Sequence, residues 1–318
     1  MDFDERMQQM NRRRSGIGPK RQALLAHVQL VLEELRDFWP LTLRQLYYQL
    51  VARGVIENAL GEYKKLSELL TEARLSGLVP WEALEDRART ILHSGGWDNQ
   101  NEFIESELAS FLEGYRRDLM QSQPHALEVW IEKDALSRIV HDVAWEYCVP
   151  VVVARGFSSI SYLHECRGRV ERNAKLGKRT KILYFGDLDP SGWEMLPAML
   201  RTLQEEMGLG DLVEGIRCAL LPDQVEQYQL PQSIDAMKES DPRTPKFKTM
   251  LRQQGYPEDL AVELDALSPS LLQGLVRQAI EAQLDIALFE RESLRQEEEL
   301  LHLAAFKEKV LSMLNDQM

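Results

Sequence analysis

Residues 181–192 constrain the fold most, because an apolar run here ends in two carboxylates. Asp187 and Asp189 stand at its end, and the turn residues Pro-Ser-Gly follow directly. Alternate residues of a strand point to the same side, so both carboxylates should face one point beyond the sheet edge. Two acids this close repel each other unless a positive group lies between them. Oxygen ligands suit Mg²⁺, with Mn²⁺ as the alternative, so the segment predicts a metal site.

A second apolar segment, residues 126–131, also ends in an acid, Glu132. Open parallel sheets carry their sites at the carboxyl ends of strands, so we expect Glu132 beside Asp187 and Asp189. A helix N-cap and turn would explain the Asp-x-Asp-Pro-Ser-Gly pattern equally well by itself. The second acidic strand end favours a Mg²⁺ site suited to phosphate chemistry.

Apolar segments alternate with helical segments in the second half of the chain, which begins near Gln123. The expected strands cover residues 127–131, 151–154 and 182–186, and the expected helices cover residues 135–147, 161–173 and 192–206. This alternation predicts an α/β fold with a parallel sheet covered on both faces. Residues 271–318 are predicted to form a long acidic amphipathic helix, or a pair of them, for packing or dimerisation.

The first part of the chain predicts three short helices. Apolar residues recur every three or four positions from Arg21 to Pro40. The second helix opens at Thr42, where Gln45 completes a capping-box spacing, and runs to Gly54. The third helix spans residues 63–76, ending before a glycine.

Residues 78–81 and 86–89 follow these helices and are expected to form an extended hairpin. Three short helices with a trailing hairpin are typical of a winged helix-turn-helix whose third helix reads DNA. An ordinary helical bundle with solvated charges is the alternative that the pattern leaves open. The phosphate contacts expected of a winged helix here are Lys64, Lys65, Arg74, Arg87 and Arg89.

These patterns divide the chain into three regions. Residues 1–20 form a basic arm without apolar periodicity. Residues 21–122 hold the helices that would bind DNA, together with a connector that has its own helix at 102–120. Residues 123–318 hold the α/β domain and its helical C-terminal extension.

The net charge of −13 is unevenly placed along the chain. Acids outnumber Lys and Arg in residues 257–318, whereas residues 1–21 are basic. Binding to nucleic acid requires a local basic surface rather than a basic total. The charge therefore neither favours nor excludes DNA.

No apolar run reaches the length of a membrane span, and the N-terminus does not resemble a signal peptide. The three cysteines, Cys148, Cys166 and Cys218, lie far apart and lack metal-ligand spacing. A reduced, cytoplasmic protein without membrane contact is the simplest interpretation.

Tyr48 lies off the apolar face of the second helix. At about 100° per residue, its neighbour Tyr47 joins the apolar side, whereas Tyr48 falls beside Arg44. We therefore expect Tyr48 to point away from the core. A cation one turn back lowers the pKa of a phenol and can hold a phosphate bidentately, as a tyrosine nucleophile requires. A surface tyrosine stacked on an arginine stem is the plainer alternative.

Three segments in chain order resemble the A subunit of type IIB topoisomerases, the family of topoisomerase VI and the meiotic double-strand-break transesterase. They read Thr-Leu-Arg-Gln-Leu-Tyr-Tyr at 42–48, Val-Trp-Ile-Glu-Lys-Asp-Ala at 129–135 and Phe-Gly-Asp-Leu-Asp-Pro-Ser-Gly at 185–192. The likeness covers residues 20–200. Residues 114–118 and the Glu-Leu-Asp-Ala-Leu of 263–267 are also similar to the stand-alone bacterial and phage Mini-A relatives.

The resemblance implies a tyrosine-bearing, CAP-like winged-helix domain followed by a Toprim domain. Tyr48 matches the nucleophile of the family, and Arg44 matches the arginine of the same motif. Gln45 departs from the pattern, since many relatives carry an acid there, which puts the fine tuning near Tyr48 in doubt.

The family's Toprim metal ligands correspond to Glu132, Asp187 and Asp189. Lys133 and Arg155 are further candidates for phosphate contacts. The resemblance thus implies Mg²⁺, or Mn²⁺, as the cofactor and double-stranded DNA as the substrate.

The resemblance further implies a homodimer that breaks both DNA strands, each tyrosine forming a 5′-phosphotyrosyl link. The chain carries no Gly-rich ATP-binding loop, so ATP-driven strand passage is not expected of it alone; a separate ATPase partner of the B type is left open. Two other functions stay open. One is a hydrolytic Toprim nuclease, with a role in defence or a mobile element, in which Tyr48 is a bystander. The other is a DNA-binding accessory without catalysis.

Overall fold

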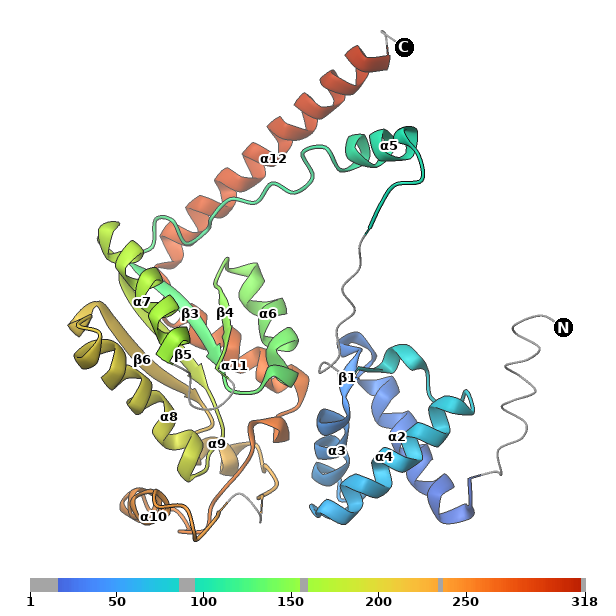
Figure 1. Cartoon of the computed structure of the whole chain (residues 1–318), viewed down its shortest axis with the longest axis vertical. Helices are drawn as coiled ribbons and strands as arrows, with labels where there is room; N and C mark the ends of the chain where they lie inside the picture. The colour runs from blue at the N-terminus through green and yellow to red at the C-terminus, as the bar shows by residue number, and fades with distance from the viewer. Residues whose placement is uncertain (1–16, 86–94, 155–159, 234–236, 316–318) are drawn as a thin grey trace, which may run out of the picture.

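The computed structural model describes residues 17–85, 95–154, 160–233 and 237–315 (Figure 1). A group of helices from the N-terminal part lies beside an α/β part, and a long helix projects away from the latter. Of the predicted basic arm of residues 1–20, residues 1–16 lie outside the described residues. The prediction is wrong for its last residues, because Ile17 is buried in the core and a helix begins at Pro19. The expected mixture of an α/β unit and a helical unit is confirmed at this level.

The α/β part is built on four parallel strands in the order β4-β3-β5-β6. They are β3 (His125–Ile131), β4 (Val151–Val153), β5 (Arg179–Phe185) and β6 (Val213–Ala219). The first three confirm the predicted strands. Strand β6 was not predicted, because Glu214, Gly215 and Arg217 interrupt its apolar pattern.

Successive residues of the strands face two separate cores, as the pleat of a strand requires. Val129 and Ile131 of β3 pack with α6 (Ser137–Glu146) and α11 (Pro269–Glu281). Trp130, between them, packs instead with α7 (Ile160–Lys175) and α8 (Pro190–Arg201). Helices therefore cover both faces of the sheet, as predicted.

The N-terminal helices are α2 (Pro19–Glu34), α3 (Leu43–Ala52) and α4 (Leu60–Leu75). The predicted capping box opens α3: the Thr42 hydroxyl accepts from the Gln45 backbone N–H at 3.2 Å, and the Gln45 side chain accepts from the Thr42 N–H at 2.6 Å. These bonds satisfy backbone donors that a helix start leaves unpaired.

The expected hairpin after α4 differs from what the described residues contain. Residues 78–80 lead into a 3₁₀ turn, Trp81–Ala83, and then into a short strand β2 (Leu84–Glu85). Strand β2 pairs in parallel with β1 (Leu41–Thr42). Residues 86–89, the expected second arm of the hairpin, lie outside the described residues.

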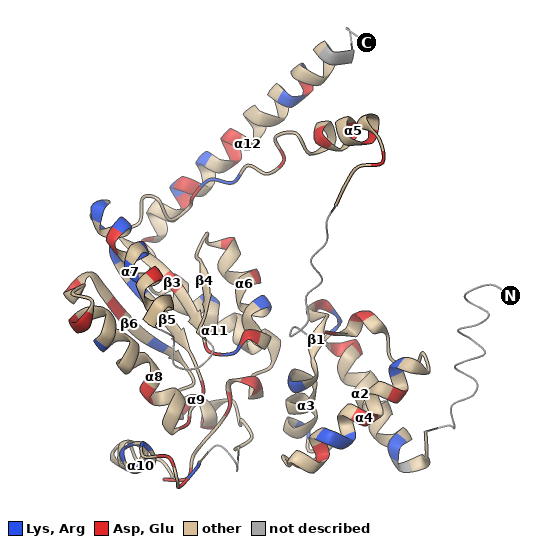
Figure 2. Ribbon diagram, in the orientation of Figure 1, with Lys and Arg blue, Asp and Glu red and all other residues tan. Residues whose placement is uncertain are grey.

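The connector holds a helix shorter than predicted, α5 (Gln100–Ser110), and then runs back along α12 (Ile286–Asn315) (Figure 1). Arg117 pairs with Glu292 at 2.7 Å and with Glu299 at 2.6 Å. Further along, Lys307 pairs with Glu113 at 2.8 Å. Figure 2 shows acidic and basic positions interspersed along α12. The ion pairs just described use some of these charges to hold the connector against the helix.

The predicted acidic C-terminal segment is therefore a pair of helices. Helix α11 packs with β3 of the sheet, whereas α12 pairs with the connector. The remaining elements are the helices α9 (Pro222–Gln227) and α10 (Thr244–Gln253), the π-helical turn Thr202–Glu206 and the 3₁₀ turns Arg36–Phe38, Asp134–Leu136, Gly210–Leu212 and Leu264–Ala266. Among the described residues, every helix is too short or too polar to cross a membrane.

A buried ion pair links α7 to the centre of the sheet. Glu128 of β3 is 2% exposed and accepts two bonds from the Arg169 guanidinium, at 2.7 and 2.9 Å. The same carboxylate accepts from the Trp130 indole N–H at 2.9 Å. Removing one partner of such a pair leaves a charge that neither water nor protein solvates.

We expect Arg169→Met to lower the free energy of unfolding by about 3 kcal/mol, because Glu128 stays buried without its counter-ion. Urea denaturation followed by circular dichroism measures the change. Arg179→Met is the matched control, since Arg179 pairs with Asp211 on the surface and should cost less than about 1 kcal/mol. Equal losses in the two variants would contradict the buried role of the Arg169 pair.

Candidate functional site

The parallel register of β3 and β5 brings Glu132 and Asp187 together. Ile131 lies opposite Phe185, so the next residues leave the sheet at the same edge. Glu132 donates its backbone N–H to the Phe185 carbonyl at 2.9 Å, and its side chain accepts from the Asp187 N–H at 3.0 Å. The sequence prediction that these two acids meet is confirmed.

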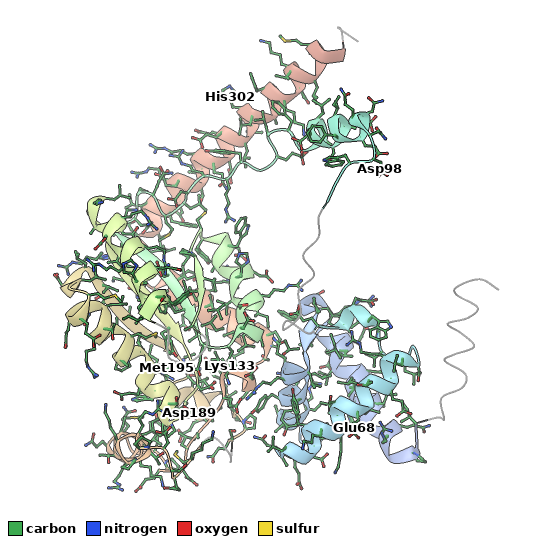
Figure 3. All side chains as sticks on the ribbon, in the orientation of Figure 1. Glu68, Asp98, Lys133, Asp189, Met195 and His302 are labelled. Atoms are coloured by element: carbon green, nitrogen blue, oxygen red, sulfur yellow. The ribbon has the colours of Figure 1, made fainter. Side chains whose placement is uncertain are left out.

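Asp189 joins the same edge as the N-cap of α8, where its carboxylate accepts from the Gly192 N–H at 2.6 Å. Figure 3 labels Asp189 and Lys133, which both lie at the end of the sheet where the strands finish. The alternative interpretation of Asp-x-Asp as a cap is thus correct for Asp189, and it does not conflict with a place in the acidic site.

Burial and mutual repulsion perturb these carboxylates. Burial, together with the charge of Asp187, raises the pKa of Glu132 to about 7. Burial also raises the pKa of Asp189, against the opposing effect of its bond to the Gly192 N–H. The edge therefore carries more negative charge than its surroundings stabilise.

Lys133 supplies part of the missing positive charge. Its ammonium lies 2.8 Å from an Asp187 oxygen, 3.3 Å from Glu263 and 3.5 Å from Asp265. Its place among three carboxylates makes Lys133 a counter-ion of the site in this conformation. The predicted phosphate contact by the same residue stays a prediction.

Glu263 and Asp265 belong to the site, although the sequence analysis assigned them no role. Residues 262 and 188 form an antiparallel bridge, which lays this segment along the acidic edge. The Leu264 N–H then donates to an Asp187 oxygen at 2.7 Å. The only sequence signal was the likeness of residues 263–267 to a known family, which does not say what these residues contact.

Arg217 of β6 is a second residue that the sequence analysis missed. Its guanidinium donates to the carbonyls of Gly192 at 2.9 Å and Gly186 at 3.2 Å, and also to the Asp187 carbonyl. It lies 4.7 Å from the centre of the Trp193 ring. Burial lowers the pKa of this guanidinium. Arg217 thus fixes the turn that carries Asp187 and Asp189, and it was missed because β6 was missed.

Arg44 connects the tyrosine-bearing helix to the acidic edge. Its guanidinium forms an ion pair with Glu263 and lies 3.1 Å from an Asp265 oxygen. The same group lies 5.9 Å from the centre of the Tyr48 ring. An ion-pair chain therefore runs from α3 through Asp265 and Lys133 to Asp187.

Tyr48 is buried, at 4% exposure, so the prediction that it points away from the core is wrong. Its hydroxyl is hydrogen-bonded to Ser233, and its ring contacts Tyr47 edge-on at 5.3 Å. Burial raises the pKa of the Tyr48 phenol, although the Arg44 charge opposes the rise. The predicted lowering effect of Arg44 is present, but burial outweighs it, so the pKa of the phenol is raised overall in the free chain. The cause is tertiary, because the α/β part covers this side of α3.

A cavity of about 240 Å³ nevertheless reaches Tyr48. Its other lining residues come from both parts of the chain; they are Arg44, Tyr47, Asn58, Leu60, Tyr63, Ser233 and Glu263. A small anionic group in this cavity would meet both the phenol and the guanidinium.

The predicted DNA contacts on α4 differ in their surroundings. Lys64 is exposed, and Lys65 pairs with Glu62 at 2.6 Å. Arg74 donates to the backbone carbonyls of Trp81 and Leu84, at 2.7 and 3.0 Å, so it holds the segment after α4. Arg87, Arg89 and Arg155 lie outside the described residues.

The three acids at the edge have the chemistry of a Mg²⁺ site, being oxygen donors with excess negative charge. In the described residues, no three His, Cys, Asp or Glu side chains are grouped as a ready metal site. Each acid instead binds a donor of the protein, as with Asp187 and Lys133. The donor set fits a divalent cation chemically, and the raised pKa of Glu132 marks the charge that a cation would relieve.

The fold and site define a mixed α/β protein whose parallel sheet ends in an acidic centre joined by ion pairs to a tyrosine-bearing helix. The chain matches no protein-family model, and no curated protein matches it significantly.

The raised pKa of Glu132 predicts a pH-dependent stability in metal-free buffer. Between pH 4.5 and 7 the native carboxyl holds a proton that the unfolded chain releases, so its contribution to stability falls as the pH rises. Above pH 7 we expect the free energy of unfolding of Glu132→Gln to exceed that of the wild type by about 3 kcal/mol. Below pH 4.5 we expect the two values to be equal.

Urea denaturation across this pH range, with a chelator present, measures the effect. Glu258→Gln is the control, because Glu258 is exposed and paired with Arg252, which lowers its pKa. A Glu132→Gln variant whose stability follows the wild type at every pH would show that Glu132 ionises normally.

Proposed function

We propose that this chain is a Mg²⁺-dependent DNA-cleaving transesterase of the type IIB topoisomerase A-subunit kind. In this proposal the N-terminal helices act as the winged-helix domain and the sheet as the Toprim domain. The observation that carries it is that one chain holds both halves of such a site: an acidic edge where Glu132 and Asp187 meet, and a helix on which Arg44 lies beside Tyr48. A tyrosine nucleophile and a metal centre must act on the same phosphate, and in a homodimer the two halves of one site can come from different subunits.

Glu132 and Asp187 would hold the cation, and Asp189 could hold a second one. When bound, Mg²⁺ would polarise the phosphate and stabilise the leaving oxygen. The donor set supports this assignment because burial, together with the charge of Asp187, raises the pKa of Glu132 to about 7, and a cation would favour the ionised carboxylate.

The reaction replaces one phosphodiester oxygen with another. The Tyr48 oxygen forms a bond to phosphorus, the bond from phosphorus to the 3′ oxygen breaks, and the phenolic proton is passed on to yield a 3′-hydroxyl. Arg44 would hold the non-bridging oxygens bidentately. Since burial raises the Tyr48 pKa in the free chain, DNA binding must bring cationic groups closer to the phenol.

One tyrosine cuts one strand, so a double-strand break requires a homodimer. By the resemblance, Tyr48 of one subunit would meet the acidic edge of the other, and an ATPase partner would be a separate chain. The three cysteines are free thiols, which is consistent with the cytoplasm as the proposed location.

A hydrolytic nuclease is the second candidate, and the 4% exposure of Tyr48 favours it. In that case water, rather than the phenol, attacks a phosphate held at the acidic edge. Hydrolysis leaves no covalent link between protein and DNA, so the two functions differ in their products.

Incubation with supercoiled plasmid and Mg²⁺ or Mn²⁺, stopped with detergent, tests the proposal. We expect DNA covalently attached to the wild-type protein and none attached to Tyr48→Phe, which lacks only the nucleophilic oxygen. Tyr47→Phe is the matched control, since its ring lies on the same helix, and it should retain adducts. Free cut ends from wild type and Tyr48→Phe alike would establish the hydrolytic nuclease instead.

Metal binding has its own test, independent of cleavage. We expect Mg²⁺ to raise the melting temperature of the wild type by several degrees, because a cation relieves repulsion in the folded state alone. Asp187→Asn should lose most of this rise, whereas Asp211→Asn, on the exposed surface, should keep it. An undiminished rise in Asp187→Asn would remove Asp187 from the metal ligands.

A further inference from the structure

Glu263 places a carboxylate between the two cations nearest to Tyr48. It forms an ion pair with Arg44, and its oxygen lies 3.3 Å from the Lys133 ammonium. The side chain is 18% exposed and lines the Tyr48 cavity. A carboxylate and a phosphodiester offer a guanidinium the same pair of anionic oxygens. Glu263 therefore occupies the position that suits a backbone phosphate.

Asp265 faces the same two cations from the protein interior. It is fully buried, 3.1 Å from the Arg44 Nε and 3.5 Å from the Lys133 ammonium. Within the described residues, neither of its carboxylate oxygens has a hydrogen-bond partner, so these two cations hold it by charge. Its place in the interior keeps it out of reach of a ligand, and removing both cations would leave a buried charge uncompensated.

Leu264, between the two acids, ties their backbone to the acidic edge through its N–H bond to Asp187. The segment is therefore held in place whether or not Glu263 stays in contact with Arg44. Glu263 can turn toward solvent by changing its own side-chain rotamer, whereas Asp265 cannot.

We propose that Glu263 is an internal substitute for phosphate, displaced by the DNA backbone, while Asp265 remains as the fixed counter-ion of Arg44 and Lys133. The inference rests on the proposed function, since it names the group with which the DNA must compete. Glu263 keeps Arg44 paired in the free chain and holds α3 against the α/β part. DNA binding breaks this contact and makes Arg44 available beside Tyr48.

Two variants that remove the same charge, two residues apart, separate this role from a general electrostatic effect. Binding of a fluorescent DNA duplex is measured by anisotropy without divalent metal, in the Tyr48→Phe background. We expect Glu263→Gln to bind about three- to fivefold tighter, because the phosphate no longer displaces an ion pair. Its affinity should also fall more steeply with salt, by about one unit of slope.

Asp265→Asn should bind no tighter than the background protein, because its carboxylate does not occupy the phosphate position. Glu263→Asp keeps the charge and should stay within twofold of the background affinity. Equal gains in Glu263→Gln and Asp265→Asn, or no gain in either, would overturn the inference while leaving DNA binding intact.

Inorganic pyrophosphate separates the inference from the proposed function, because it probes the anion site without DNA. We expect it to raise the melting temperature of Glu263→Gln by at least about 2 °C more than that of the wild type, since the site is vacated. A pyrophosphate effect without duplex binding would support the anion site and contradict a DNA function. Equal shifts in the two proteins would contradict the anion site itself.

Discussion

The parallel pairing of β3 with β5 is the constraint on which the site depends. Its register sets Ile131 opposite Phe185, so Glu132 and Asp187 leave the sheet side by side. Without that register the two acids would not share the bond from the Asp187 N–H to the Glu132 carboxylate. Burial and the nearby charge of Asp187 both raise the pKa of Glu132, and the charge of Lys133 offsets part of the rise.

The compensating cations come from three places in the fold. Lys133 follows β3 directly, Arg217 reaches the turn after β5 from the neighbouring strand, and Arg44 arrives on a helix of the N-terminal part. Glu263 and Asp265 then pair with Lys133 and Arg44, which makes the contact between the two parts of the chain electrostatic as well as apolar. Phosphate chemistry at such a site would use cations that the fold has already positioned. One of these cations would first have to break its ion pair with an acidic side chain.

Several features could be predicted because their causes are local. The capping box at Thr42 requires only Gln45 three residues later, and the strands β3, β4 and β5 are marked by their own apolar runs. Strand β6 could not be found in this way, because Arg217 interrupts its apolar pattern. The arginine is explained only by its hydrogen bonds to the neighbouring turn, which is distant in the sequence. Likewise, no local sequence pattern at residues 263–265 indicates that this segment contacts Asp187 and Arg44.

The sequence by itself determined the strands β3, β4 and β5, the points where Glu132 and Asp187 follow two of them, and the place of Tyr48 one turn from Arg44. Helical periodicity assigned Tyr48 to the solvent side, because it can only compare residues within one helix. The tertiary structure decided otherwise: segments from the α/β part, including Ser233, cover that side of α3 and raise the pKa of the phenol. Burial of a helix face depends on what packs against it, and here the partner is distant in the chain.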